Sequence, residues 1–213
     1  MGTIKNATGQ INRPGGFIIT DKAFSICSFP AKAKILDLGC GSGATVEHLN
    51  LRYGLEAFGL DNNLGMSGNQ SNLIWAAAEE IPFPSGSFDG VLMECSLSEM
   101  DNQAVVLKEC KRVLKAGGHL IISDLYSRGE PAKLQGCLGH INTQEYLVAL
   151  MAENGFTSEH FEDFTDHLQA FWGQMIFAQG AKAFYCSLGA DPETMKRIKC
   201  GYFLMVARKK AQL

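Results

Sequence analysis

The sequence predicts an α/β protein with an open, mostly parallel sheet, and three observations lead to this fold class. The apolar run 35–38 leads into alternating glycines and then into a segment that can form a helix. A second apolar run ends in an acidic residue, Asp61. Further short apolar runs then alternate with helical patterns. Such alternation builds βαβ units, whose parallel strands share one sheet.

Composition limits the class of protein. The chain has 213 residues, of which 46% are hydrophobic and 19% charged, as expected for one folded domain spanning 1–213. A formal net charge of −3 gives no indication of a nucleic-acid partner. No stretch has the length and apolar character of a membrane-spanning helix or a signal peptide, so we expect no membrane partner.

The seven cysteines are odd in number and include no C-x-x-C pair. This pattern argues against a disulfide framework and against a structural zinc site. Reduced thiols in a cytoplasmic protein without a metal site are the simplest interpretation.

The glycine turn carries the strongest local signal. Gly39, Gly41 and Gly43 follow the strand with the spacing G-x-G-x-G, whereas dinucleotide-binding proteins use G-x-G-x-x-G. Asp37 lies at the end of the strand. Its carboxylate would repel a phosphate group but attract an ammonium or sulfonium group. The turn therefore favours a nucleoside-like ligand that has a cationic end.

The second strand, 55–60, ends at Asp61, 22 positions after Gly39. This offset is close to that of the acid that binds ribose in nucleotide-binding folds. A carboxylate at this place can accept hydrogen bonds from two adjacent ribose hydroxyls.

The elements before and between these strands are predicted from caps and breakers. Asp21 is expected to cap a helix over 22–29, and residues 62–70 form a short helix or turn. A third strand covers 73–76, and prolines make 77–87 a loop.

The second half of the chain continues the alternation. A fourth strand covers 88–93, Asp101 caps a helix that stops at Gly117 and Gly118, and a fifth strand covers 119–123. A loop then covers residues 127–141. A helix follows over 144–153, capped by Asn142 or Thr143 and ended at 154–155. The last two strands cover 156–164 and 202–207.

Four motifs in this order resemble those of class I S-adenosylmethionine (SAM)-dependent methyltransferases of the type 11-like, small-molecule group. They cover residues 36–43, 59–61, 78–89 and 112–118. The resemblance implies a Rossmann-like, doubly wound, seven-stranded sheet with an antiparallel last strand in a three-layer α/β/α sandwich. It also implies SAM as cofactor, S-adenosylhomocysteine as product, and a leader, 1–30, that lies over the site.

The resemblance further implies which residues bind the cofactor. They are Asp37, Gly39, Cys40, Gly41, Gly43, Asp61, Asn62, Ala78, Glu79 and Glu94. One position departs from the family pattern, because Ala77 stands where the family usually has an acid that accepts from the adenine amino group. Recognition of adenine is then left to backbone groups near Ala78 or to Glu79.

No single residue is indicated as catalytic, since methyl transfer from SAM mainly requires that the acceptor be oriented in line and that water be excluded. A general base is needed only for an acceptor that is protonated at working pH. Five residues follow the fourth and fifth strands and are candidates to face a small-molecule methyl acceptor: Glu94, Ser96, Glu99, Asp124 and Tyr126.

Residues 165–199 form an aromatic-rich insertion before the last strand. It either adds to the core, or forms a contact in a homodimer, or forms the wall or lid of the acceptor pocket. Two other function classes also remain open. A dinucleotide-dependent dehydrogenase is disfavoured by the glycine spacing and by Asp37. A non-catalytic SAM-binding accessory or interaction protein is kept open by Ala77 and by the insertion.

Overall fold

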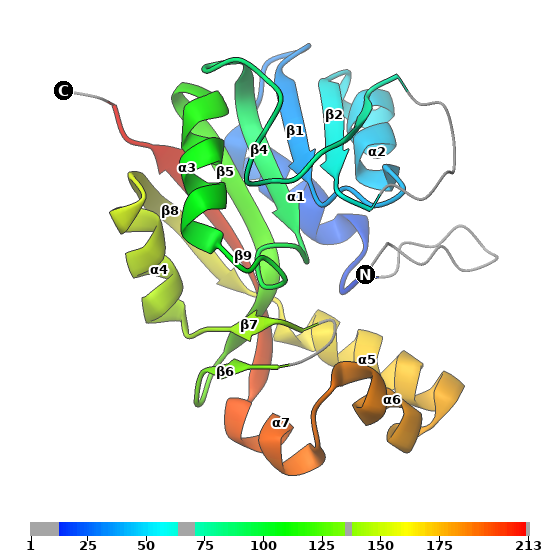
Figure 1. Ribbon diagram of the computed structural model, residues 1–213. Helices are drawn as coiled ribbons and strands as arrows, with labels where there is room; N and C mark the ends of the chain where they lie inside the picture. Colours follow the sequence, from blue (N-terminus) through cyan, green and yellow to red (C-terminus); the bar gives the residue numbers. More distant parts are fainter. Residues whose placement is uncertain (1–12, 64–70, 135–137, 212–213) are drawn as a thin grey trace.

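A computed structural model gives the structure of the protein, described for residues 13–63, 71–134 and 138–211 (Figure 1). Within these ranges the chain forms helices and strands in the order α1 (Phe17–Cys27), β1 (Lys34–Leu38), α2 (Ala44–Tyr53), β2 (Glu56–Asp61), β3 (Leu73–Trp75), β4 (Phe88–Glu94), α3 (Gln103–Val113), β5 (Leu114–Ser127), β6 (Ala132–Lys133), β7 (His140–Ile141), α4 (Gln144–Glu153), β8 (Phe156–Asp163), α5 (Thr165–Gln179), α6 (Ala181–Leu188), α7 (Pro192–Ile198) and β9 (Cys200–Lys209).

The main sheet has seven strands in the order β3-β2-β1-β4-β5-β9-β8. The first five strands of this order are parallel to one another, and β9, the last strand in the sequence, is antiparallel to both β5 and β8. The strand order reverses beside β1, so β1 and β4 lie at the point where α/β sheets bind ligands. The predicted doubly wound sheet with an antiparallel last strand is confirmed.

Helices cover both faces of the sheet because its strands are apolar on both sides. Ile35 packs in one hydrophobic cluster with residues of α1 and α2, whereas its neighbour Leu36 packs in a second cluster with residues of α3 and α4. Successive strand residues point to opposite faces, and both of these side chains are fully buried. Each such burial stabilises the fold by about 1.5–3 kcal/mol.

The first helix begins earlier than the sequence predicted. It starts at Phe17, so Asp21 lies inside α1 and does not cap it. The Asp21 carboxylate instead contacts His48 and Tyr53 of α2, at 2.7 and 2.8 Å. Because these partners lie far away in the sequence, they could not be predicted from it. The residue type alone suggested a cap, but Asp21 makes a tertiary contact instead.

Two boundaries around α3 were also predicted wrongly. The side chain of Asn102, not Asp101, caps the helix by accepting a hydrogen bond from the Val105 amide. The helix ends at Val113, and β5 begins at Leu114 and continues to Ser127, well beyond the predicted strand. Gly117 has φ +71 and lies where the pairing of β4 with β5 shifts register, a backbone conformation that favours glycine.

Other boundaries differ less. The predicted loop 127–141 contains the small antiparallel pair β6–β7, and α4 is capped by Thr143. The final strand is longer than predicted at both ends. Most of the predicted helix or turn at 62–70 lies outside the described residues.

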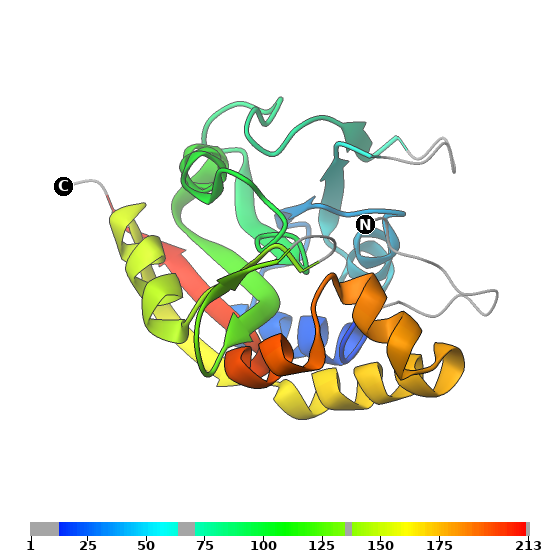
Figure 2. The ribbon, with the colours of Figure 1, turned by 60° about the horizontal axis from the view of Figure 1, so that its bottom comes forward.

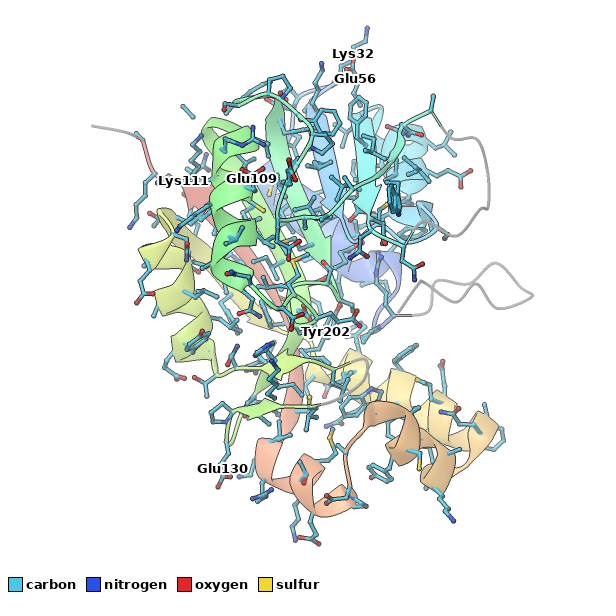
Figure 3. All side chains as sticks on the ribbon, viewed as in Figure 1. Lys32, Glu56, Glu109, Lys111, Glu130 and Tyr202 are labelled. Carbon is cyan, nitrogen blue, oxygen red and sulfur yellow. The ribbon has the colours of Figure 1, made fainter. Side chains whose placement is uncertain are left out.

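The loop between β3 and β4 is held in place by two residues of α3. Arg112 donates hydrogen bonds to the carbonyl oxygens of Ile81 and Phe83 and pairs with Glu109 (labelled in Figure 3). The Glu109 carboxylate in turn accepts from the Ile81 amide at 2.9 Å. Arg112, the first residue of the 112–118 motif, thus positions the loop whose Ala78 and Glu79 line a cavity together with Gly39.

The insertion 165–199 folds into α5, α6 and α7, which lie beyond the carboxyl ends of the parallel strands (Figures 1 and 2). The helix α5 packs against α6 and against β9. This position places the insertion over the end of the sheet where β1 and β4 terminate.

Candidate functional site

Two adjoining cavities lie at the carboxyl ends of β1, β2, β4 and β5. The first cavity is lined by Gly39, Leu60, Asp61, Asn62, Asn63, Ala76, Ala78, Glu79, Cys95, Ser96, Glu99, Met100 and Asp101. The second cavity is lined by Arg13, Pro14, Asp37, Gly39, Cys40, Ala44, Thr45, Glu94, Cys95, Ser98, Glu99, Asp124, Leu125, Leu138, Leu168, Phe171, Trp172, Met175, Ser187, Leu188 and Tyr202. Gly39, Cys95 and Glu99 line both, so the two cavities meet at the ends of β1 and β4.

The glycine turn lies where the cavities meet. Gly39 has φ +77, and a Cβ added there would lie 2.6 Å from the Cβ of Ser96. Ser96 is itself fixed, because its hydroxyl donates to the Leu38 carbonyl oxygen at 2.8 Å. Both the backbone conformation and the close contact therefore require glycine at this position. Ser96, a predicted candidate to face the methyl group, holds the turn together and also lines the first cavity.

Asp61, predicted to bind ribose, lines the first cavity. One of its oxygens accepts from the Gly41 amide at 2.8 Å and the other from the Asn63 amide at 2.7 Å. Each carboxylate oxygen can accept more than one hydrogen bond. The two backbone donors thus orient the group while leaving it able to accept from two hydroxyls of a ligand.

The far wall of the first cavity includes Asn62, Ala78 and Glu79, three of the residues predicted to bind the cofactor. Ala77 is not among the residues that line it. The wall also includes Ala76 and Met100, which sequence reasoning missed. Their spacing gave no signal, since small and apolar residues near a nucleoside site are indistinguishable by type from core residues.

Two buried acids lie in the second cavity, Asp37 at the end of β1 and Glu94 at the end of β4. In the described part of the chain no hydrogen bond reaches the Asp37 carboxylate, although the residue is only 3% exposed. Burial raises its pKa well above the ordinary value, the nearby Glu94 raises it further, and the charge of Arg13 partly opposes the rise. Removing a carboxyl group from water disfavours its charged form, and a cationic ligand group in the cavity would stabilise that form.

Glu94 is paired with Arg13, which comes from the chain preceding α1. The Arg13 Nη1 lies 2.7 Å from Glu94 Oε2, and the guanidinium also donates to Thr20 and Thr45. Both of these hydroxyls in turn donate to the Glu94 carboxylate, at 2.6 and 3.0 Å. Sequence reasoning missed Arg13, because its partners lie far away in the sequence.

The residues present fit a SAM-like ligand. Acceptors for a diol lie in the first cavity, at Asp61, and a buried acid lies in the second, at Asp37. The glycine turn lies between them. A phosphate-bearing ligand would place negative charge against Asp37, which disfavours the dinucleotide class.

Asp124 lies one strand further along the sheet, in the second cavity. It accepts from the Ser98 amide at 2.9 Å, the Ser98 hydroxyl at 2.8 Å and the Leu125 amide at 2.7 Å. Burial nevertheless raises the pKa of Asp124 to about 6. The Ser98 and Leu125 donors lower this pKa, and the charge of Glu99 raises it. Near neutral pH Asp124 is therefore a poorly solvated base in the lining of the second cavity.

Tyr202 of β9 is a lining residue that sequence reasoning missed, because the residue was read only as the start of the last strand. It is fully buried near the centre of the molecule (labelled in Figure 3). Its hydroxyl oxygen lies 3.0 Å from the Cys95 sulfur and donates to Ser123. Cys95 has φ +53, a conformation that is uncommon for a residue with a side chain.

The insertion supplies the apolar wall of the second cavity. Leu168, Phe171, Trp172 and Met175 come from α5, and Leu188 comes from α6. Leu168, Phe184 and Leu188 also belong to the first hydrophobic cluster, so the placement supports both the pocket wall and the addition to the core that the sequence left open for residues 165–199.

The remaining predicted residues take other positions. Gly41 and Gly43 line neither cavity, although the Gly41 amide orients Asp61 and Gly43 precedes α2. Cys40 lines the second cavity and packs so closely on Gly59 that a Cβ there would lie 2.6 Å from its sulfur. Tyr126 lines neither cavity, and its hydroxyl donates to Asp163 at 2.6 Å.

The described residues contain no group of three or more histidine, cysteine or acidic side chains that could hold a metal ion. Six cysteines in the described ranges are free thiols, and Cys137 lies outside those ranges. Among the helices described, none is long and apolar enough to cross a membrane.

Comparison with known proteins finds methyltransferases. A family model described as a methyltransferase domain matches residues 36–122. The 27-O-demethylrifamycin SV methyltransferase of Amycolatopsis mediterranei is 24% identical, covering 90% of this chain and 82% of that protein. The O-methyltransferase rstn1 of Aspergillus nomiae is 30% identical, covering 62% of this chain and 68% of that protein.

A solved structure has the same fold. The geranyl diphosphate C-methyltransferase of Streptomyces coelicolor A3(2), in complex with Mg²⁺, geranyl diphosphate and S-adenosylhomocysteine, superposes with a TM-score of 0.73 at 16% identity. The match covers 89% of this chain and 79% of that one.

Proposed function

The chain belongs to the class I SAM-dependent methyltransferases, and on this premise we propose that it methylates a small molecule bound in the second cavity. One observation carries the proposal. The cavity with the diol-binding acid and the cavity with the apolar wall share Gly39, Cys95 and Glu99. A cofactor that extends from Asp61 to Asp37 therefore lies directly beside the space for an acceptor.

The cofactor supplies an electrophilic methyl group on a sulfonium. In our proposal Asp61 accepts from the ribose hydroxyls, and Asp37 with Glu94 binds the ammonium of the methionine end. Asn62, Ala78 and Glu79 border the adenine. Each assignment is supported by the position of the residue in the cavity lining.

The chain contributes mainly orientation and exclusion of water. The apolar side chains of α5 and α6 close the second cavity on the side away from the sheet, which favours in-line approach of a bound acceptor. Small-molecule acceptors are consistent with the rifamycin methyltransferase among the relatives.

Asp124 is the group we propose to take the acceptor's proton. It lines the acceptor cavity, it is buried, and three fixed donors orient it. Asp37 and Glu94 are assigned to the cofactor, Ser96 to the turn, and Tyr126 hydrogen-bonds Asp163 outside the cavities. Of the sequence candidates, Glu99 remains as a second acid beside Asp124.

The proposed function is tested by calorimetric titration with SAM and with NAD, followed by assay of S-adenosylhomocysteine across a panel of small acceptors. We expect SAM to bind, NAD not to bind, and the product to form with at least one acceptor. Tight SAM binding without product from any acceptor would instead support the accessory protein that the sequence left open.

Asp61→Ala is expected to weaken SAM binding at least tenfold, about 1.4 kcal/mol or more, because two hydrogen bonds to the ribose are lost. Calorimetry at constant ionic strength measures the change. Asp166→Ala, which removes an exposed acid from α5, is the matched control and should leave the affinity unchanged. Equal affinities of the two variants for SAM would show that Asp61 does not bind the cofactor.

A further inference from the structure

The second cavity is strongly acidic. Its lining contains four acids, Asp37, Glu94, Glu99 and Asp124, and among the described residues that line it Arg13 is the only basic side chain. The Arg13 guanidinium already contacts Glu94, Thr20, Thr45 and the carbonyl oxygen of Gly16. Its charge is therefore balanced within the protein and is not available to an acceptor.

The acids divide between the two ligands by their place in the sheet. Asp37 and Glu94 end β1 and β4, where the proposed function puts the cationic end of the cofactor. Asp124 lies on β5, the next strand, and Glu99 acts on it electrostatically. The donors to the Asp124 carboxylate are the neutral Ser98 and Leu125 groups, so its negative charge faces the part of the cavity left for the acceptor and would repel an anionic acceptor.

The opposite wall is apolar. Leu138, Leu168, Phe171, Trp172, Met175 and Leu188 form it. Such a wall binds an apolar body and leaves few groups to solvate a charge. Apart from Ser187 of α6, the polar groups that the cavity offers the acceptor lie on the side formed by the sheet and by the chain before α1.

We propose that the acceptor is an uncharged, largely apolar molecule that presents a hydroxyl group to Asp124, and that the cavity rejects anionic acceptors. The inference rests on the proposed function and specifies its acceptor. In the step, the hydroxyl oxygen forms a bond to the methyl carbon, and the carbon–sulfur bond breaks with its electron pair retained by sulfur. The hydroxyl proton passes to the Asp124 carboxylate.

A hydroxyl fits this position better than an ammonium group. The Asp124 carboxylate accepts from Ser98 and Leu125 and retains lone pairs for one more donor, which a hydroxyl can supply while its oxygen remains nucleophilic. An ammonium group would pair with Asp124 but has no lone pair with which to attack.

The test compares three naphthalene probes by calorimetry on the protein saturated with S-adenosylhomocysteine: 2-naphthol, 2-naphthoate and protonated 2-naphthylmethylamine. We expect 2-naphthol to bind at least tenfold more tightly than 2-naphthoate and to be the probe methylated when SAM is supplied. Asp124→Asn should raise the affinity for 2-naphthoate at least tenfold. Asp166→Asn, which removes the same charge from the surface of α5, should leave the ratio unchanged.

A measurement on the unmutated protein guards against misfolding of the variant. The titratable groups that face Asp124 in the described chain are Glu99, Cys95 of β4, and Cys200 and Tyr202 of β9, none of them cationic. Lowering the pH through about 6 protonates Asp124 and removes its charge. The affinity for 2-naphthoate, which stays ionised, should then rise.

Three results would overturn the proposal. The first is that 2-naphthoate binds as tightly as 2-naphthol, or that neither binds detectably. The second is an affinity for 2-naphthoate that does not change with Asp124→Asn or with pH. The third is methylation of the amine in preference to the naphthol. Loss of S-adenosylhomocysteine binding itself would count against the proposed function, so the two failures are distinguishable.

Discussion

Asp124→Asn is expected to lower kcat for a hydroxylated acceptor by on the order of 100-fold, while the affinity for SAM stays within about twofold. The reason is that the asparagine amide cannot take the proton that the acceptor loses as its oxygen is methylated. The fold loses some stability, about 1–3 kcal/mol, because an asparagine oxygen that accepts from the Ser98 amide places its NH2 group against the Leu125 amide donor. Steady-state kinetics with SAM at saturation measures kcat, and calorimetry measures the cofactor affinity.

The pH profile separates proton transfer from a structural role. The pKa of Asp124 is raised to about 6, so the carboxyl group is protonated and inactive below that value and becomes an effective base above it. The kcat/KM of the unmutated enzyme should rise with pH through about 6, and Asp124→Asn should lose this limb. Asp166→Asn should keep the profile. A variant that retains the limb would show that another group accepts the proton.

Arg13→Met is expected to destabilise the cofactor-free protein by about 3–5 kcal/mol, because it leaves a buried carboxylate without its cation. The side chains of Arg13 and Glu94 are only 11% and 3% exposed, and they meet at 2.7 Å. Methionine keeps much of the volume of the arginine stem, so the loss reports charge and hydrogen bonding more than packing. Urea unfolding without cofactor measures the free energy of unfolding.

Two comparisons test this explanation. Arg52→Met removes an exposed arginine that lies 3.5 Å from Asp21, and it should cost no more than about 1 kcal/mol. The double variant Arg13→Met with Glu94→Gln should recover much of the lost stability, because no buried charge is then left unpaired. Strictly additive effects of the two substitutions would contradict the proposed pairing.

The part of the fold and site that could be predicted depends on residues close together in the sequence. The strand–turn–helix unit around Gly39 and the acid at Asp61 were both predicted from spacing, and the structure brings them into one cavity. The position of Asp37 at the end of β1 was predicted in the same way. These features are local, because a glycine turn and a strand end are set by the backbone of a few successive residues.

Helix boundaries were less predictable where side chains had tertiary partners. Asp21 has the residue type of a cap, but it contacts His48 and Tyr53 across a helix pair. Asn102 and Asp101 were equally suitable by type, and backbone geometry selected Asn102.

The sequence by itself determined the sheet, the glycine turn and the acids at its strand ends, since strand periodicity and turn chemistry act over short distances. Only the tertiary structure decided that Arg13 pairs with Glu94, that Tyr202 from the last strand joins the cavity, and that 165–199 form its apolar wall. These three features join segments up to 189 positions apart, from Arg13 to Tyr202. No local sequence pattern predicts these contacts, because they depend on how the whole sheet places its elements in space.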